Sequence, residues 1–282
     1  MKWRLTDREL DLARPLGLGI VNVTDDSFFS GARSGTAVGA ITDGVRLASE
    51  GFDLIDLGAV AARNGPTVSI ADEASRLIPA IEGLARRIEL PISADTFNPV
   101  VARLAVAAGA AAINDISGGS EAIFEAVAET GCGYVLMHIE GPPRVERPKP
   151  DYPDVVARLL EFFAERIELA QRYGVDREQI VVDPGLDFDL DLADNLAILN
   201  RLDALAGLGR PIFMSLSRKD FLGAILAGSW VQRLPPGRCE AATAAATALA
   251  VSRGALLHRL HDRSALDAMR VAAAIRDGAD GG

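Results

Sequence analysis

The stretch ISADTFNPVVARLAVAAGAAAIND, residues 92–115, places two short apolar runs on either side of an alanine-rich segment. The runs at 92–94 and 111–114 lack the in-and-out alternation of a half-exposed strand, so each is predicted to be a strand buried on both faces. The tract at 102–112, rich in alanine and glycine, is predicted to be a helix packed closely on the sheet. This strand–helix–strand unit is typical of a parallel α/β sheet.

The same alternation continues in both directions along the chain. Further apolar runs at 18–23, 54–57, 134–137, 180–182, 211–215 and 255–257 bring the predicted strands to eight. Segments of helical period lie between them, most clearly at 36–50, 72–86 and 153–173. Eight β/α units in 282 residues favour a single (β/α)8 TIM barrel, usually about 250 residues long, over a doubly wound open sheet. No low-complexity linker divides residues 1–282, so one domain is expected.

The composition excludes several classes of protein. Hydrophobic residues make up 49% of the chain and charged residues 24%, which excludes wholesale disorder. A formal net charge of −10 argues against nucleic acid or an anionic membrane as the main partner. The two cysteines form neither a disulfide framework nor a CxxC zinc pair. The N-terminus lacks the apolar run of a signal peptide, and the longest apolar stretches are too short to span a bilayer. We therefore expect a soluble, cytoplasmic protein.

Polar residues follow the predicted strands, at the end of the barrel where chemistry takes place. Asp95, Asn114 and Asp183 come at or directly after the last apolar residue, and their carboxylate and amide groups can read the N–H edge of a heterocycle. Positive charge is predicted around the same mouth, from Arg63, Arg218, Lys219, Arg259 and His261. Polar loops are common in any fold, but this combination predicts a ligand with a polar ring at one end and an anionic group at the other.

Six motifs, in matching order and spacing, resemble the dihydropteroate synthase family over about residues 17–275. They are GIVNVTDDSF at 19–28, NDISG at 114–118, LMH at 136–138, DPG at 183–185, SRK at 217–219 and RLHD at 259–262. The resemblance implies a (β/α)8 barrel, usually a homodimer, that acts in folate synthesis. It implies condensation of 6-hydroxymethyl-7,8-dihydropterin pyrophosphate with p-aminobenzoate, with release of pyrophosphate and with Mg2+ as cofactor.

The resemblance also implies roles for individual residues. It assigns the pterin ring to four residues: Asp95, Asn114, Asp183 and Lys219. It assigns the leaving pyrophosphate to Arg63, Arg259 and His261, and the Mg2+–pyrophosphate contact to Asn22. Ser217, Arg218 and Lys219 would border the p-aminobenzoate site. Arg63, Lys219, Arg259 and His261 are the candidate catalytic residues.

Several positions depart from the family's usual pattern. Ser30 replaces a loop acid, Ala61 and Ala62 replace two hydroxyl residues, and Ser215 stands where glycine is usual. After residues 183–185 the family commonly has Gly-Phe-Gly-Lys, whereas this chain has Asp187, Phe188, Asp189 and Leu190. Some of these changes are similar to the sulfonamide-resistant synthases, so sulfonamides are expected as ligands that inhibit the enzyme less strongly than usual.

Two alternatives stay open on the sequence alone. One is a pterin-binding paralogue with weak or no synthase activity, and the other is a barrel of the methyltetrahydrofolate:corrinoid methyltransferase type. The five aspartates at 183–194 lack the glycine and glutamate spacing of an EF-hand, so a solvated loop is favoured over a calcium site, although metal or substrate contact by Asp187, Asp189 and Asp191 stays open.

Overall fold

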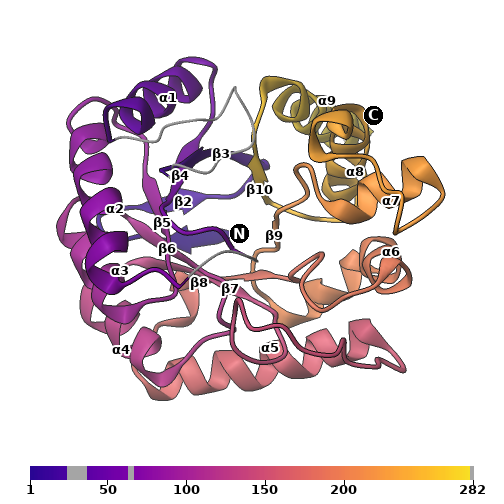
Figure 1. Cartoon of the computed structure of the whole chain (residues 1–282), viewed down its shortest axis with the longest axis horizontal. Helices are drawn as coiled ribbons and strands as arrows, with labels where there is room; N and C mark the ends of the chain where they lie inside the picture. The colour runs from indigo at the N-terminus through magenta and orange to yellow at the C-terminus, as the bar shows by residue number, and fades with distance from the viewer. Residues whose placement is uncertain (24–36, 63–66, 280–282) are drawn as a thin grey trace.

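Eight parallel strands form a nearly closed barrel in a computed structural model that describes residues 1–23, 37–62 and 67–279. Figure 1 looks along the barrel, with the strands at the centre and the helices around them. The strands pair in the order β8-β7-β6-β5-β4-β3-β10-β9. Their bounds are β3 Leu16–Asn22, β4 Leu54–Gly58, β5 Ile92–Asp95, β6 Ala112–Asp115, β7 Gly133–Met137, β8 Ile180–Asp183, β9 Phe213–Met214 and β10 Leu257–Leu260.

The ring closes between β8 and the segment that leads into β9. Val182 and Ile212 form an isolated parallel bridge, and the Val182 N–H donates to the Pro211 carbonyl at 3.0 Å. The predicted (β/α)8 barrel is therefore confirmed. The eighth strand begins at Leu257 rather than at residue 255, so Arg259 lies within β10 and not after it.

The helices alternate with the strands and cover the outside of the barrel (Figure 1). Their bounds are α1 Ala37–Ser49, α2 Ile70–Ala85, α3 Pro99–Ala107, α4 Glu121–Thr130, α5 Val155–Arg172, α6 Leu192–Asn200, α7 Asp220–Ala227, α8 Glu240–Ser252 and α9 Arg263–Ala279. Local signals set several starts. Ser69, Asn98 and Asp154 each accept backbone N–H groups at the first turn of α2, α3 and α5. The predicted helix at 102–112 was misplaced, because Asn98 and Pro99 start α3 earlier and the chain leaves it after Ala107.

A two-stranded antiparallel hairpin precedes the barrel and was not predicted. Its strands are β1 Lys2–Arg4 and β2 Glu9–Asp11. Trp3 is fully buried, and its indole N–H donates to the Gln179 carbonyl at 2.7 Å. Trp3 packs in one apolar cluster with strand residues that include Leu18 and Phe213. The hairpin thus covers the strands near their N-terminal ends, the end opposite the polar strand ends described below.

None of the helices within the described residues is both long and apolar enough to cross a membrane.

Candidate active site

The carboxyl ends of four neighbouring strands lie in register at one level of the barrel, and three of them place a polar side chain there. Asn22 of β3 pairs in register with Gly58 of β4, Gly58 with Asp95 of β5, and Asp95 with Asn114 of β6. In a parallel sheet, residues in register project to the same face. Gly58 leaves room for its neighbour, because a Cβ there would lie 3.2 Å from the Asp95 Cβ. The structure therefore brings three predicted site residues together in one layer.

Arg259 connects this layer to the last strand of the barrel. Its Nε donates to Asp56 Oδ2 at 2.6 Å, and its Nη2 donates to Asp95 Oδ2 at 2.8 Å. The Asn114 amide lies 3.4 Å from the same Asp56 oxygen. Asp56 is fully buried in β4 and was not among the predicted site residues. An aspartate inside the apolar run LIDLG was the signal that could have identified it.

Burial raises the pKa of two carboxyl groups at the strand ends, those of Asp183 and Asp95. Desolvation raises the pKa of Asp183 to about 6, although the Gly185 N–H and the charges of Lys219 and Arg259 oppose the shift. Desolvation also raises the pKa of Asp95, opposed mainly by Arg259 and reinforced by the neighbouring Asp56. Asp183 Oδ1 accepts the Gly185 N–H at 2.8 Å, which fixes the carboxylate at the end of β8. Such a site favours ligands whose N–H donors stabilise the ionised carboxylates.

Ser217 and His261 lie together on the adjacent side of the mouth. The Ser217 hydroxyl is 2.9 Å from His261 Nδ1, and it also accepts the His261 backbone N–H at 3.3 Å. Burial and the positive charges of Arg218, Arg259 and Lys219 lower the pKa of His261 to about 3. The predicted positive charge on His261 is therefore wrong for the ligand-free protein at neutral pH, where the ring is neutral.

Arg218 and Lys219 follow Ser217 at the start of α7. Arg218 adopts a left-handed backbone with φ 62° and lies 3.5 Å from Asp262. The Lys219 ammonium donates to the Leu186 carbonyl at 2.9 Å and lies 4.8 Å from the centre of the Phe188 ring. Both cations thus reach the mouth from the β9–α7 connection, next to the turn that follows Asp183.

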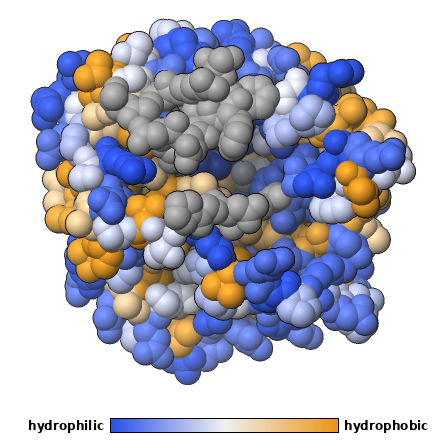
Figure 2. All heavy atoms as spheres, in the orientation of Figure 1, coloured by the Kyte–Doolittle hydropathy of each residue, from blue (hydrophilic) through white to orange (hydrophobic). Residues whose placement is uncertain are grey.

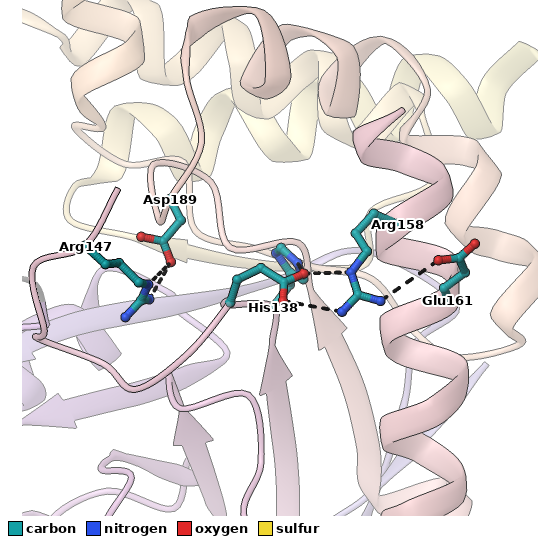
Figure 3. Close-up of polar contacts among 6 residues, drawn as sticks. His138, Arg147, Arg158, Glu161 and Asp189 are labelled. Carbon is teal, nitrogen blue, oxygen red and sulfur yellow. Dashed lines mark hydrogen bonds and ion pairs between the residues drawn. The ribbon is translucent and has the colours of Figure 1, made fainter. Parts of the chain in front are cut away.

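The acidic loop after β8 holds the surrounding loops together. Asp187 accepts backbone N–H groups at the start of α7, and Asp191 accepts the Asp194 N–H at the start of α6. Asp189 forms an ion pair with Arg147, which Figure 3 shows reaching across from the loop after β7. Lys149 lies 2.7 Å from Asp191 and 2.8 Å from Asp194. These aspartates are therefore engaged in caps and ion pairs, and Leu190 between them is buried.

His138 at the end of β7 belongs to a separate, packed cluster. Its side chain is fully buried and meets the Phe162 ring edge-on, with the ring centres 4.8 Å apart. The Glu140 carboxylate lies 3.4 Å from His138 Nε2 and accepts the Arg158 Nε at 2.7 Å. Figure 3 shows Arg158 between this contact and Glu161. The hydrogen bonds from His138 and Arg158 lower the pKa of Glu140 to about 2.

The remaining positions singled out in the sequence follow β3, β4 and β9 along the chain. Arg63 and Ser30 lie outside the described residues. Ala61 is exposed, Ala62 packs beside an apolar cluster of Ile116, Met137 and Ile139, and Ser215 is half-buried after β9. Figure 2 views this face of the molecule and shows hydrophilic side chains in the hollow near its centre.

A family model described as pterin binding enzyme matches residues 18–261. The dihydropteroate synthase of Escherichia coli strain K12 is 35% identical over 274 residues, which are 96% of this chain and 95% of that protein. The chain belongs to the dihydropteroate synthase family. Mycobacterium leprae has a relative named inactive dihydropteroate synthase 2 that is 38% identical over 272 residues, covering 93% of this chain and 90% of that protein.

Solved dihydropteroate synthases share the whole fold. The enzyme from Xanthomonas albilineans in complex with 7,8-dihydropteroate superposes with a TM-score of 0.85 at 41% identity, over 98% of this chain and 99% of that one. The Yersinia pestis synthase in complex with a sulfonamide drug gives a TM-score of 0.91 at 33% identity, over 99% of this chain and 100% of that one. The resemblance inferred from six short motifs thus extends over the entire barrel.

Proposed function

We propose that this dihydropteroate synthase joins 6-hydroxymethyl-7,8-dihydropterin pyrophosphate to p-aminobenzoate, giving 7,8-dihydropteroate and pyrophosphate. The observation that carries the proposal is the layer of Asp95 and Asn114, bound to Arg259 at one side. The ring-reading groups and a cation for the leaving group thus lie in direct contact before any substrate binds. Asp183, Lys219 and Ser217 complete the mouth from the neighbouring strands.

The residues support a division of roles around the pterin methylene. Asp95, Asn114 and Asp183 accept from or donate to the edge of the ring, and Lys219 supplies a donor beside it. Loss of pyrophosphate leaves a cationic pterin methylene, the p-aminobenzoate nitrogen forms a bond to that carbon, and the proton that the nitrogen then loses passes to water or to the released pyrophosphate. Ser217 and Arg218 border this second substrate. Arg259 and His261 stabilise the departing pyrophosphate, with Arg63 assigned to the same task by its motif. Holding the weakly basic aniline in line contributes more than a strong base would.

The donor set fits a Mg2+ ion that arrives with the pyrophosphate. Among the described residues no three His, Cys, Asp or Glu side chains converge on a metal position, and Asn22 offers one amide oxygen at the end of β3. Mg2+ is commonly bound by one or two protein ligands together with substrate phosphates and waters. When bound, it would neutralise the charge of the leaving group.

The proposal extends to sulfonamide sensitivity, oligomeric state and location in the cell. Reduced sulfonamide sensitivity is supported by the departures at Ser215, Ala61 and Ala62, which change side-chain volume and polarity close in sequence to the mouth. A homodimer and a cytoplasmic location are proposed from the family alone. The matched relatives do not favour the corrinoid methyltransferase alternative. A measurement of turnover distinguishes an active synthase from a non-catalytic paralogue.

The test is pyrophosphate release by purified protein with both substrates and Mg2+, with and without a sulfonamide. Release that stops when Mg2+ is chelated and resumes on its return supports the reaction and the cofactor. Pyrophosphate release that persists at sulfonamide concentrations that inhibit the E. coli enzyme supports reduced sulfonamide sensitivity. Pterin binding without release, seen by titration calorimetry, would overturn the synthase proposal in favour of a paralogue.

A further inference from the structure

We propose that Asp187 is a positioning residue for Lys219, which it fixes through the turn 186–188 and through the first turn of α7. The inference rests on the proposed function, because the Lys219 ammonium matters to catalysis only if it binds the pterin. Asp187 itself is nine-tenths buried. It stands in the loop that departs most clearly from the usual family pattern.

The two residues on either side of Asp187 hold the ammonium of Lys219. The Leu186 carbonyl accepts from Lys219 Nζ at 2.9 Å, and the Phe188 ring lies 4.8 Å from the same nitrogen. A carbonyl dipole and an aromatic face both attract a cation. The position of the ammonium group therefore follows the position of this turn.

The carboxylate of Asp187 holds the backbone that directly follows the same lysine. Its Oδ2 accepts the Asp220 N–H at 2.6 Å, and its Oδ1 accepts the Phe221 N–H at 3.2 Å. These groups are the first two N–H groups of α7, which begins directly after Lys219. Lys219 is the N-cap residue and makes no side-chain cap, so Asp187 supplies from a distant loop the acceptor that a local Ser or Asp supplies in other helices.

The turn itself is anchored to the protein interior. The Asp187 N–H donates to Asn195 Oδ1 at 2.9 Å, and Asn195 is fully buried on α6. The Phe188 N–H donates to the Gly185 carbonyl at 2.9 Å, two residues after Asp183. Asp187 has φ 68°, a left-handed conformation that glycine adopts freely and other residues adopt at a cost. The strained backbone places the carboxylate toward α7, where a glycine would offer no acceptor.

Asp187 thus connects Asp183 and Lys219, two of the four candidate pterin groups, which come at or after the ends of neighbouring strands of the barrel. Losing the carboxylate frees the start of α7, and the Lys219 backbone moves relative to the turn that holds its ammonium. Small displacements of a positioned charge cost activity in a preorganised site. We expect the loss to appear in the KM for the pterin substrate and in its direct binding, with a smaller change in kcat.

The experiment compares Asp187→Gly and Asp187→Asn with the unaltered protein. Glycine keeps the left-handed backbone and removes the acceptor, whereas asparagine tolerates the same backbone and retains one carbonyl oxygen. We expect Asp187→Gly to raise the KM for the dihydropterin pyrophosphate about tenfold, the scale of one lost charge-assisted hydrogen bond. Asp187→Asn should recover most of that loss.

Asp154→Gly is the matched control. Asp154 Oδ1 also accepts two backbone N–H groups at a helix start, at 3.0 and 3.1 Å on α5. The Asp154 carboxylate pairs with Arg201 as well, at 2.9 Å, but it contacts no candidate site residue. The control should lower Tm and leave the KM unchanged. Equal falls in Tm for Asp187→Gly and Asp154→Gly with an unchanged pterin KM would overturn the positioning role, as would an asparagine variant as impaired as the glycine variant.

Binding of the dihydropterin pyrophosphate, measured by titration calorimetry, separates this inference from the proposed function. An unaltered protein that binds the pterin and releases no pyrophosphate contradicts the synthase proposal alone. In that case weaker pterin binding by Asp187→Gly than by Asp154→Gly still supports the positioning role, and equal binding overturns it.

Discussion

Arg259 and Asp56 form an ion pair of 2.6 Å between residues 203 positions apart in the chain. The pair joins the last strand of the barrel to β4, and the second guanidinium nitrogen reaches Asp95 at 2.8 Å. A cation proposed for the leaving group is thus oriented by one buried carboxylate and shared with another that is proposed to read the pterin. Asp56 belongs to none of the six motifs, so its one signal in the sequence is an aspartate inside an apolar strand.

Asp56→Ala should be strongly destabilising and should lower activity. Removing one partner of a buried pair typically costs about 3–5 kcal/mol, because the other charge stays buried without full compensation. Urea unfolding monitored by circular dichroism measures the loss. Asp56→Asn, which keeps an acceptor for Arg259, should lose less. An unfolding midpoint that stays unchanged in Asp56→Ala would show that the ion pair contributes little.

Pterin affinity should fall on acidification below pH 6. Burial raises the pKa of Asp183 to about 6, and only the ionised carboxylate accepts from ring N–H donors. Binding then requires loss of a proton, so the affinity should fall about tenfold per pH unit below the pKa. Titration calorimetry from pH 5 to about 8 tests this, with Asp183→Asn expected to bind weakly and to keep only the pH dependence that Asp95 contributes. An affinity that is constant over this range would contradict the assignment.

The raised pKa of Asp183 also makes the free energy of unfolding depend on pH. The folded-state pKa of Asp183 lies above the 3.8 of an unperturbed aspartate, so ionisation of this group opposes folding. Its contribution to stability is present below pH 3.8 and is lost as the pH rises through about 6. Asp183→Asn should remove this contribution, so its unfolding free energy should decline less steeply than that of the unaltered protein over the same window.

The features that were predicted best from the sequence are those that one short segment determines. The apolar runs identified all eight barrel strands, and Asp95, Asn114 and Asp183 were found because each closes such a run. Features that depend on distant partners were missed. Asp56 looks like a strand interior until Arg259 is placed beside it, and the Asp187 cap exists only because α7 starts next to the β8 loop. The three-residue strands β1 and β2 carry too few side chains to show a period.

Trp3→Ala should destabilise the barrel without changing the kinetic constants. Trp3 is fully buried beneath the strands, and replacing a buried tryptophan by alanine typically costs about 3–5 kcal/mol. Trp3→Phe keeps most of the volume and loses the bond to Gln179, so it should cost only about 1 kcal/mol beyond the change in packing. Thermal unfolding combined with steady-state kinetics tests both variants. A changed pterin KM in Trp3→Phe would show that the hairpin influences the mouth.

Asp189→Ala should be less stable than Asp189→Gly by about 1 kcal/mol, although both lose the ion pair with Arg147. Asp189 has φ 55°, and alanine pays the left-handed penalty that glycine avoids, partly offset by the greater freedom of glycine in the unfolded chain. Arg147→Ala keeps the aspartate backbone and removes the ion pair together with the hydrogen bonds from Arg147 to the Pro142 and Val145 carbonyls, so it separates the loss of these side-chain contacts from the backbone strain. Urea unfolding of the three variants separates the two effects. Equal stability of the alanine and glycine variants would show that the loop relaxes to another conformation once the ion pair between the β7 and β8 loops is lost.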